Sequence, residues 1–206
     1  LKRLMFTVIV ALLPALVFGT YNVGYQYYLA IGVEPASQWD IWWIGIQKVI
    51  PIVVVAYVAG LFVAEFAFSV VRQHPVQEGY LVSGMLIPLI MPPTIPLWQV
   101  AVASIFAVVI AKEAFGGTGM NVLNVALVAR AFLYFAYPGY MSGDQVWVHL
   151  GGQAAVDGFS GATPLGVIAA TVESGQNAVQ ALSQFGDTYS LSNLFIGFHP
   201  GSIGET

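Results

Sequence analysis

The sequence predicts an all-α fold of about five helices embedded in a membrane. Of its 206 residues, 58% are hydrophobic and only 8% are charged, whereas soluble domains are about a quarter charged. Apolar runs recur over the first two-thirds of the chain, and a helix needs roughly 20 such residues to cross a bilayer. The net charge of −4, without a basic stripe, argues against a nucleic-acid partner. Because cysteine is absent, the chain cannot supply thiolates to an iron–sulfur cluster.

The first two helices are marked by long apolar runs. The first is predicted over residues 4–19, after the basic Lys2 and Arg3, and we expect it to be an uncleaved helix. Residues 20–43 are rich in tyrosine and tryptophan, which is typical of a loop at a membrane–water interface. The second helix is predicted over residues 49–71, before the polar stretch RQHPVQEG.

Three shorter helices follow. Those over residues 80–91 and 97–111 flank PPTIP, where the prolines predict a turn. Because both are short for a bilayer, we expect them to tilt or to form a re-entrant pair covered by protein. The fifth, over residues 122–137, follows the glycine-rich break KEAFGGTGMN. These boundaries predict a helical membrane bundle over residues 1–137 and an extracytoplasmic, glycine-rich loop region over residues 138–206.

The distribution of charge predicts the orientation through the positive-inside rule. An amino terminus in the cytoplasm places four basic residues on that side: Lys2, Arg3, Arg72 and Lys112. The predicted outer loops hold the acids Glu34, Asp40, Asp144, Asp157, Glu173, Asp187 and Glu205. Lys48, at the outer end of the second helix, is the exception. This orientation places DGFSGAT, residues 157–163, outside the cytoplasm.

Ionisable residues within the apolar runs are candidates for function, because charge is costly in a bilayer. Glu65 lies in the second helix, where it could bind a cation, relay protons, or remain a neutral hydrogen-bonded acid. Arg130 is expected to pair with Glu65 or Glu113, or to hold an anionic cofactor. Lys112 and Glu113 are expected at a solvated helix end.

Two asparagines follow the glycine-rich break. Asn121 and Asn124 are three residues apart, so in a helix they would share a face. Their amides can both donate and accept hydrogen bonds, as a heteroaromatic ring with carbonyl groups requires. Alternatively, they cap the helix and bond to neighbouring helices. The segment is not a Walker loop, and the chain has no dinucleotide fingerprint, so it is not expected to oxidise NADH alone.

The stretch DGFSGATPLG combines a hydroxyl nucleophile with flexible backbone. Thr163 offers a hydroxyl that an external transferase could activate. Gly158 and Gly161 permit sharp turns and close approach by another chain, and Asp157 and Ser160 could orient an incoming group. From its composition alone, the stretch could equally be a simple turn.

The stretch resembles a known modification signal. DGFSGAT is similar to the flavinylation motif Asp-x-x-Ser/Thr-Gly-Ala-Thr, in which a flavin transferase esterifies FMN through its phosphate to the last threonine. The resemblance makes Thr163 the FMN-bearing residue, and the other matching positions are Asp157, Ser160, Gly161 and Ala162.

The whole chain resembles the B-type membrane component of the sodium-translocating NADH:quinone oxidoreductases (Na+-NQR), and more distantly the D-type component of the Rnf complexes. The similar segments include LKRLMFTVIVALLPALVFGTYNVG, VVRQHPVQEGY, AKEAFGGTGMN, ARAFLYFAYP and PGSIGE. The resemblance implies a multi-pass protein of the bacterial inner membrane, about twice this length, that acts only within its complex. Its partners would include an FMN-bearing C-type component, membrane iron–sulfur proteins and a flavin transferase. Electrons would pass from FMN on the C-type component to the FMN on this chain, then to riboflavin and quinone, and drive sodium export.

The resemblance also implies roles for individual residues. Asn121 and Asn124 match asparagines near the riboflavin, and Glu65 matches an acid linked to sodium uptake. The quinone pocket would include Glu78, Gly79 and Tyr80.

The chain departs from the family pattern at three places, one of which is a loop between Pro138 and Asp157 that is longer than usual. Val125 replaces a proline, which predicts a straighter fifth helix, and Leu61 and Phe62 stand where the family has two glycines. The alternatives are an Rnf-type electron-transport protein, a secondary transporter or channel without flavin, and a scaffold without a cofactor.

Overall fold

The computed structural model describes residues 2–72, 79–156, 159–173, 177, 182 and 185–205. Every regular element within these ranges is helical, which confirms the predicted all-α class. In the described part of the chain, three helices are long and apolar enough to cross a membrane: Met5–Ile31, Gln38–Val63 and Leu97–Phe115. Two shorter apolar helices, Tyr80–Leu89 and Val125–Ala136, lie among them. The chain therefore has the fold of a polytopic helical membrane protein.

The first helix, α1 (Lys2–Ile31), is longer than predicted. It continues through residues 20–31, which we expected to form a loop. Aromatic residues mark a membrane interface without breaking a helix, and this stretch also has a face to bury. Asn22, Val23 and Ala30 are all buried there, so packing extends the helix beyond the predicted end.

The second helix begins eleven residues before its predicted start. α2 (Gln38–Tyr57) continues into the wider π-helix η1 (Val58–Glu65) and then into α3 (Phe66–Arg72). Its start is fixed by a capping box at Ser37, whose Oγ accepts a hydrogen bond from the Trp39 N–H at 3.3 Å. In return, the Ser37 N–H donates to the Asp40 carboxylate at 2.9 Å. The two bonds satisfy backbone groups that a helix start otherwise leaves unpaired.

Glycines bring α1 and α2 into backbone contact. A Cβ atom on Gly45 would lie 1.9 Å from the Thr20 carbonyl oxygen, and one on Gly24 would lie 2.0 Å from the Ile41 carbonyl oxygen. Small residues at such crossings allow membrane helices to pack closely. The first two helices therefore form a pair whose spacing depends on glycine.

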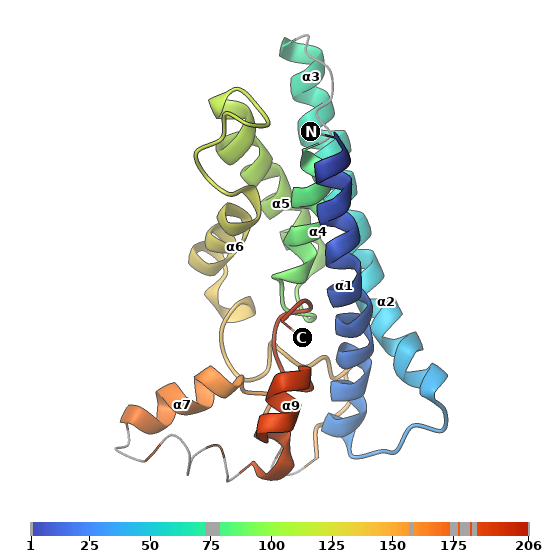
Figure 1. The fold of residues 1–206 in the computed structure, drawn as a ribbon. Coiled ribbons are helices and arrows are strands. Elements are labelled where there is room, and N and C mark those ends of the chain that lie inside the picture. Colours follow the sequence, from blue (N-terminus) through green and yellow to red (C-terminus); the bar gives the residue numbers. More distant parts are fainter. Residues whose placement is uncertain are drawn as a thin grey trace.

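The next two helices form a helical hairpin. α4 (Tyr80–Leu89) descends from the end of the bundle where the chain begins, and α5 (Leu97–Ala107) returns toward that end through η2 (Val108–Lys112) and η3 (Glu113–Phe115) (Figure 1). The turn between them lies near the middle of the bundle, and its Met91 is fully buried. The turn of the hairpin is therefore covered by protein.

The carbonyl groups at the end of α4 are satisfied by distant parts of the chain. The N–H groups of Gly204 and Ile203 donate to Leu89 and Met91 at 2.7 and 3.1 Å. Arg130 Nη1 donates to the Ile90 carbonyl at 2.7 Å. Arg130 therefore caps a helix inside the bundle, where we had predicted an ion pair or a cofactor contact. Non-helical backbone at membrane depth requires such partners because water is absent.

The remaining elements complete the bundle and its far end. α6 (Val125–Ala136) packs beside α5 and is followed by η4 (Pro138–Tyr140). α7 (Pro164–Glu173), η5 (Gly186–Tyr189) and α9 (Leu191–Ile196) lie at the end opposite the amino terminus (Figure 1).

Lys112 and Glu113 are buried, with exposed fractions of 2% and 0%. The prediction of a solvated helix end there was therefore wrong. The Lys112 Nζ lies 5.9 Å from the centroid of the Tyr80 ring, so the bundle core encloses the junction of η2 and η3.

Candidate functional site

Thr163 lies at the amino-terminal end of α7. Its Oγ1 accepts a hydrogen bond from the Gly166 N–H at 3.1 Å, and its carbonyl accepts one from the Val167 N–H at 3.0 Å. Thr163 thus occupies the N-cap position, which threonine commonly fills. The half-buried hydroxyl is placed where helix N–H groups and the helix dipole favour negative charge. A phosphate group is suited to this position.

The residues before Thr163 are held in a small core of their own. Ala162 is buried with Val167 and Tyr189, and the Tyr189 hydroxyl donates to the Ala162 carbonyl. The Ser160 Oγ accepts the Ala162 N–H at 3.4 Å, while Asp157 lies outside the described residues. Our sequence reasoning missed Tyr189, because no local pattern links it to a motif 27 residues earlier.

Gly161 lies directly against another part of the loop region. A Cβ atom at this position would lie 2.5 Å from the Asp144 carbonyl oxygen, a backbone atom that cannot move aside as a flexible side chain would. Gly161 is buried. Glycine is therefore favoured at this position of the motif because the backbone packs closely against the segment around Asp144.

We predict that Gly161→Ala displaces the loop and lowers covalent flavin by at least about tenfold, because a clash with backbone costs on the order of 1–3 kcal/mol. The measurement is flavin fluorescence of the denatured protein band, normalised to protein. Gly139→Ala is the control, since a Cβ there meets nothing within 4 Å. Normal flavin in Gly161→Ala would contradict the prediction.

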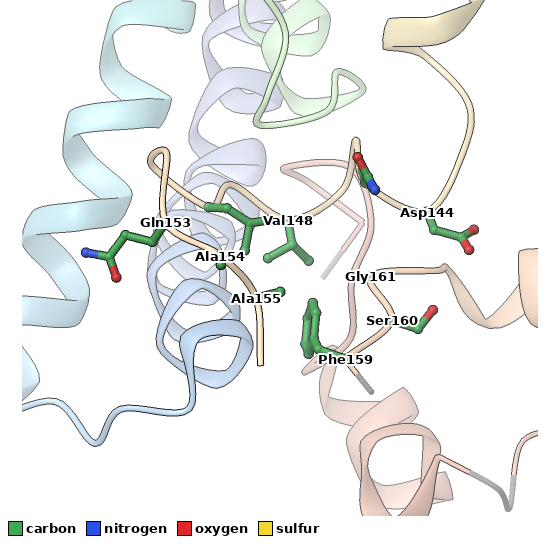
Figure 2. A pocket seen from close by; sticks show the side chains of 10 residues that line it. Asp144, Val148, Gln153, Ala154, Ala155, Phe159, Ser160 and Gly161 are labelled. Atoms are coloured by element: carbon green, nitrogen blue, oxygen red, sulfur yellow. The ribbon is translucent and has the colours of Figure 1, made fainter. Parts of the chain in front are cut away.

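A cavity of about 420 Å³ opens beside the motif. Figure 2 shows the ring of Phe159 lying beside Val148 and Ala155, whereas the Asp144 carboxylate and the Ser160 hydroxyl point away from them. Ligand pockets commonly have volumes of about 300–1,000 Å³ and aromatic walls. The cavity could therefore accommodate a planar aromatic group, and the motif residues in its wall precede Thr163 by only two to four positions.

Tyr189 also makes the loop sensitive to high pH. Burial, with a smaller contribution from the negative charge of Asp144, raises the pKa of Tyr189 to about 12. The folded protein thus keeps a proton that the unfolded chain releases near pH 10. This contribution to stability is complete below pH 10 and is lost as the pH rises from about 10 through 12.

We therefore predict that wild type exceeds Tyr189→Phe in stability by about 1 kcal/mol at pH 8, the value of one hydrogen bond. The difference should shrink between pH 10 and 12, because only the wild type can ionise at this position. Thermal melting of both proteins across this range measures it. A difference that stays constant with pH would refute the assigned cause.

The second group of predicted residues lies at the opposite end of the bundle. Asn124 is the N-cap of α6, and its Oδ1 accepts the N–H groups of Ala126 and Leu127 at 3.0 and 3.2 Å. Asn121 precedes the helix, and its Oδ1 accepts the Gly119 N–H at 3.3 Å. The two asparagines therefore do not share a helix face, because the glycine-rich loop delays the helix start. Of the two roles proposed from the sequence, helix capping is the one that Asn124 has here.

A cavity of about 270 Å³ nevertheless brings these residues together. Asn121, Asn124 and Gly79 line it, together with Thr118 and with Met5 from the first turns of α1. Val125, also in its wall, is the first residue of α6. Because a proline is tolerated at that position without bending a helix, the expectation that its loss straightens the helix was wrong.

Of the other predicted site residues, Tyr80 is not among the described residues that line this cavity. Glu78 lies outside the described residues. Tyr80 is fully buried, and its hydroxyl donates to the Ala56 carbonyl at 2.7 Å. Glu65 is the last residue of η1, although its side chain is outside the described part of the structure. π-helical turns of this kind are frequent at functional sites.

Comparison with known proteins finds similarity over the whole length of the chain. The NQR2, RnfD, RnfE family matches residues 1–206. The chain is 45% identical over 226 residues to the B-type subunit of the Na(+)-translocating NADH-quinone reductase of Chromohalobacter salexigens, an alignment that covers all of this chain and 51% of the relative. The same subunit is 42% identical in Stutzerimonas stutzeri and in Yersinia pestis, again over all of this chain and over 53% and 54% of the relatives. The chain thus spans about half the length of the curated relatives it matches, and it belongs to the NQR2, RnfD, RnfE family.

Proposed function

We propose that this chain forms part of a membrane subunit that relays electrons toward quinone through FMN esterified to Thr163, coupled to export of sodium. The observation that carries the proposal is the position of Thr163. Its hydroxyl caps α7, within a loop that matches the flavinylation motif, and a cavity of about 420 Å³ with the Phe159 ring in its wall opens beside this loop. The names of the relatives, which specify sodium translocation and quinone reduction, support the direction and purpose of the relay.

The residues around Thr163 fit FMN. The N–H groups at the start of α7 would face the phosphate, and Pro164, as the first helical residue, removes none that the helix needs. The Phe159 ring offers an apolar face for the isoalloxazine. When bound, the flavin supplies the redox chemistry, and the protein positions it and sets its surroundings.

The opposite cavity is proposed to hold riboflavin through the amides of Asn121 and Asn124. Gly79 in the same wall supports a quinone site nearby, and Glu78 and Tyr80 are proposed to belong to that site. Glu65 is the proposed sodium-linked acid. Movement of one ion against about 100 mV costs about 2.3 kcal/mol, which electron transfer to quinone would have to supply.

The proposed surroundings follow from these roles. The amino-terminal end of the bundle would face the cytoplasm of a bacterium, and the Thr163 loop would lie outside the inner membrane. A flavin transferase would modify that loop, an FMN-bearing C-type component would deliver electrons there, and membrane iron–sulfur proteins would complete the complex.

The test is to purify the full protein from its native host, image the denatured band under ultraviolet light and mass-map the Thr163 peptide. A fluorescent band with the mass of FMN on Thr163 is the expected result. A dark band from a host that flavinylates the C-type component would overturn the covalent relay.

A second candidate is a transporter or channel without flavin. The meeting of α4 and α5 near the middle of the bundle favours it, because interrupted helices often line solute sites. A dark band would favour this second function. An Rnf-type protein shares the motif and would give a fluorescent band, and its electron acceptor would distinguish it.

A further inference from the structure

A second cavity at the α7 end of the molecule is lined by tyrosines. It has a volume of about 420 Å³ and lies between the end of α1 and the start of α2, which diverge toward their connecting loop (Figure 1). Tyr21, Tyr25 and Tyr28 line it, together with Glu34 and Gln38. None of these residues belongs to the flavin motif or to the asparagine cavity.

The tyrosine rings form an ordered wall. Their spacing of four and three residues places them on one face of α1, and all three are half-buried. The rings of Tyr21 and Tyr25 stack with an interplanar angle of 15° and centroids 6.5 Å apart. The Tyr21 hydroxyl donates to Gln38 Oε1 at 2.9 Å, which holds the wall against α2. Aromatic ring faces are electrically negative and attract cations.

The charges around this wall have the same sign. Glu34 lines the cavity, and no lysine or arginine is among the described residues that line it. Asp40, in the first turn of α2, adds a second negative charge two residues after Gln38, which lines the cavity. Ring faces and carboxylates together select a positively charged ligand, and they disfavour an anion.

The position of the cavity along the membrane normal indicates which kind of cation it could meet. About 20 helical residues span a hydrocarbon core of about 30 Å, and counting from Met5, where the apolar span begins, reaches Tyr25. Tyr25 and Tyr28 are among the last residues of the apolar span Met5–Ile31, so we place them near the level of the lipid headgroups. The nearby Trp39 and Trp43 are exposed, as is usual for residues that contact this layer.

We propose that this cavity binds the ammonium headgroup of a zwitterionic phospholipid, with the ammonium group against the Tyr25 and Tyr28 rings and near Glu34. Phosphatidylethanolamine has this chemistry, whereas phosphatidylglycerol offers no cation to the rings. The site would anchor the α1–α2 end of the bundle to one class of lipid.

The experiment uses the full protein in its purified complex, equilibrated with equal amounts of phosphatidylethanolamine and phosphatidylglycerol and examined by native mass spectrometry. Wild type should retain phosphatidylethanolamine preferentially. Tyr25→Leu should lower that preference about two- to fivefold, the effect of one exposed cation–π contact. Tyr25→Phe should keep it, because the ring face remains.

Two further variants separate recognition from folding. Glu34→Gln alters only an exposed side chain and should also lower the preference. Tyr140→Leu removes another exposed tyrosine, away from the cavity, and should have no effect. Equal retention of both lipids by wild type, or an unchanged preference in both Tyr25→Leu and Glu34→Gln, would overturn the proposal.

Discussion

Thr163→Val is expected to remove all covalently bound FMN from the protein while leaving it folded. Valine keeps the branched shape of threonine but lacks the hydroxyl that the proposed ester requires. It also removes the acceptor for the Gly166 N–H, which costs about 1 kcal/mol as the loss of a helix cap. A domain stability of about 5–15 kcal/mol can absorb this loss. The measurements are fluorescence of the denatured band, the mass of the peptide, and the thermal melting temperature.

Thr171→Val is the matched control for this prediction. Thr171 lies in the same helix, α7, and its hydroxyl donates to the Val167 and Ile168 carbonyls, so it is not exposed to a transferase in the same way. Full flavin in Thr171→Val with none in Thr163→Val would assign the attachment to one hydroxyl. FMN remaining on Thr163→Val would show that another residue carries it, and the proposed relay would need a different site.

If flavin is lost, electron transfer to quinone by the assembled complex should fall with it. A complex that keeps its quinone reductase activity without FMN on this chain would contradict the relay but not the attachment. The two measurements therefore separate the chemical modification from its proposed use.

The sequence predicted those parts of the fold whose cause is local. Proline at Pro92 and Pro93 predicted the turn between α4 and α5, and the apolar runs predicted a helical membrane protein. The boundaries of α1 and α2 were predicted incorrectly, for two different reasons. The capping box at Ser37 could have been read from the sequence, because an acid follows three residues later. The continuation of α1 through Asn22 could not, because it depends on burial against distant segments.

The candidate sites divide in the same way. The motif identified Thr163 from its neighbours in sequence, but the contacts that hold the motif come from Asp144 and Tyr189, which no local pattern connects to it. The spacing of Asn121 and Asn124 suggested a shared helix face, whereas the loop geometry made one a cap and put both in one cavity. The sequence therefore named candidate chemical groups, but it did not predict how they are arranged.

Gly45→Ala is expected to destabilise the protein strongly, although the same change usually stabilises a helix. In an isolated helix, alanine is favoured over glycine by about 1 kcal/mol. At Gly45, however, the added Cβ would lie 1.9 Å from the Thr20 carbonyl oxygen, a backbone atom of α1. No rotamer change relieves such an overlap, so α1 and α2 must separate along their contact. Overpacking of this kind costs about 1–3 kcal/mol, and more when backbone must move.

The sign of the change is the decisive measurement, because helix propensity and packing predict opposite directions. We expect Gly45→Ala to lower the melting temperature of the detergent-solubilised protein and to reduce its yield in membranes, and Gly24→Ala, which faces the Ile41 carbonyl, to do the same. Gly139→Ala, where a Cβ meets nothing within 4 Å, should leave both quantities nearly unchanged. A raised melting temperature in Gly45→Ala would mean that α1 and α2 are not in backbone contact at this crossing. Tyr21, Tyr25 and Tyr28 would then lose the fixed spacing from α2 on which the cation-binding cavity depends.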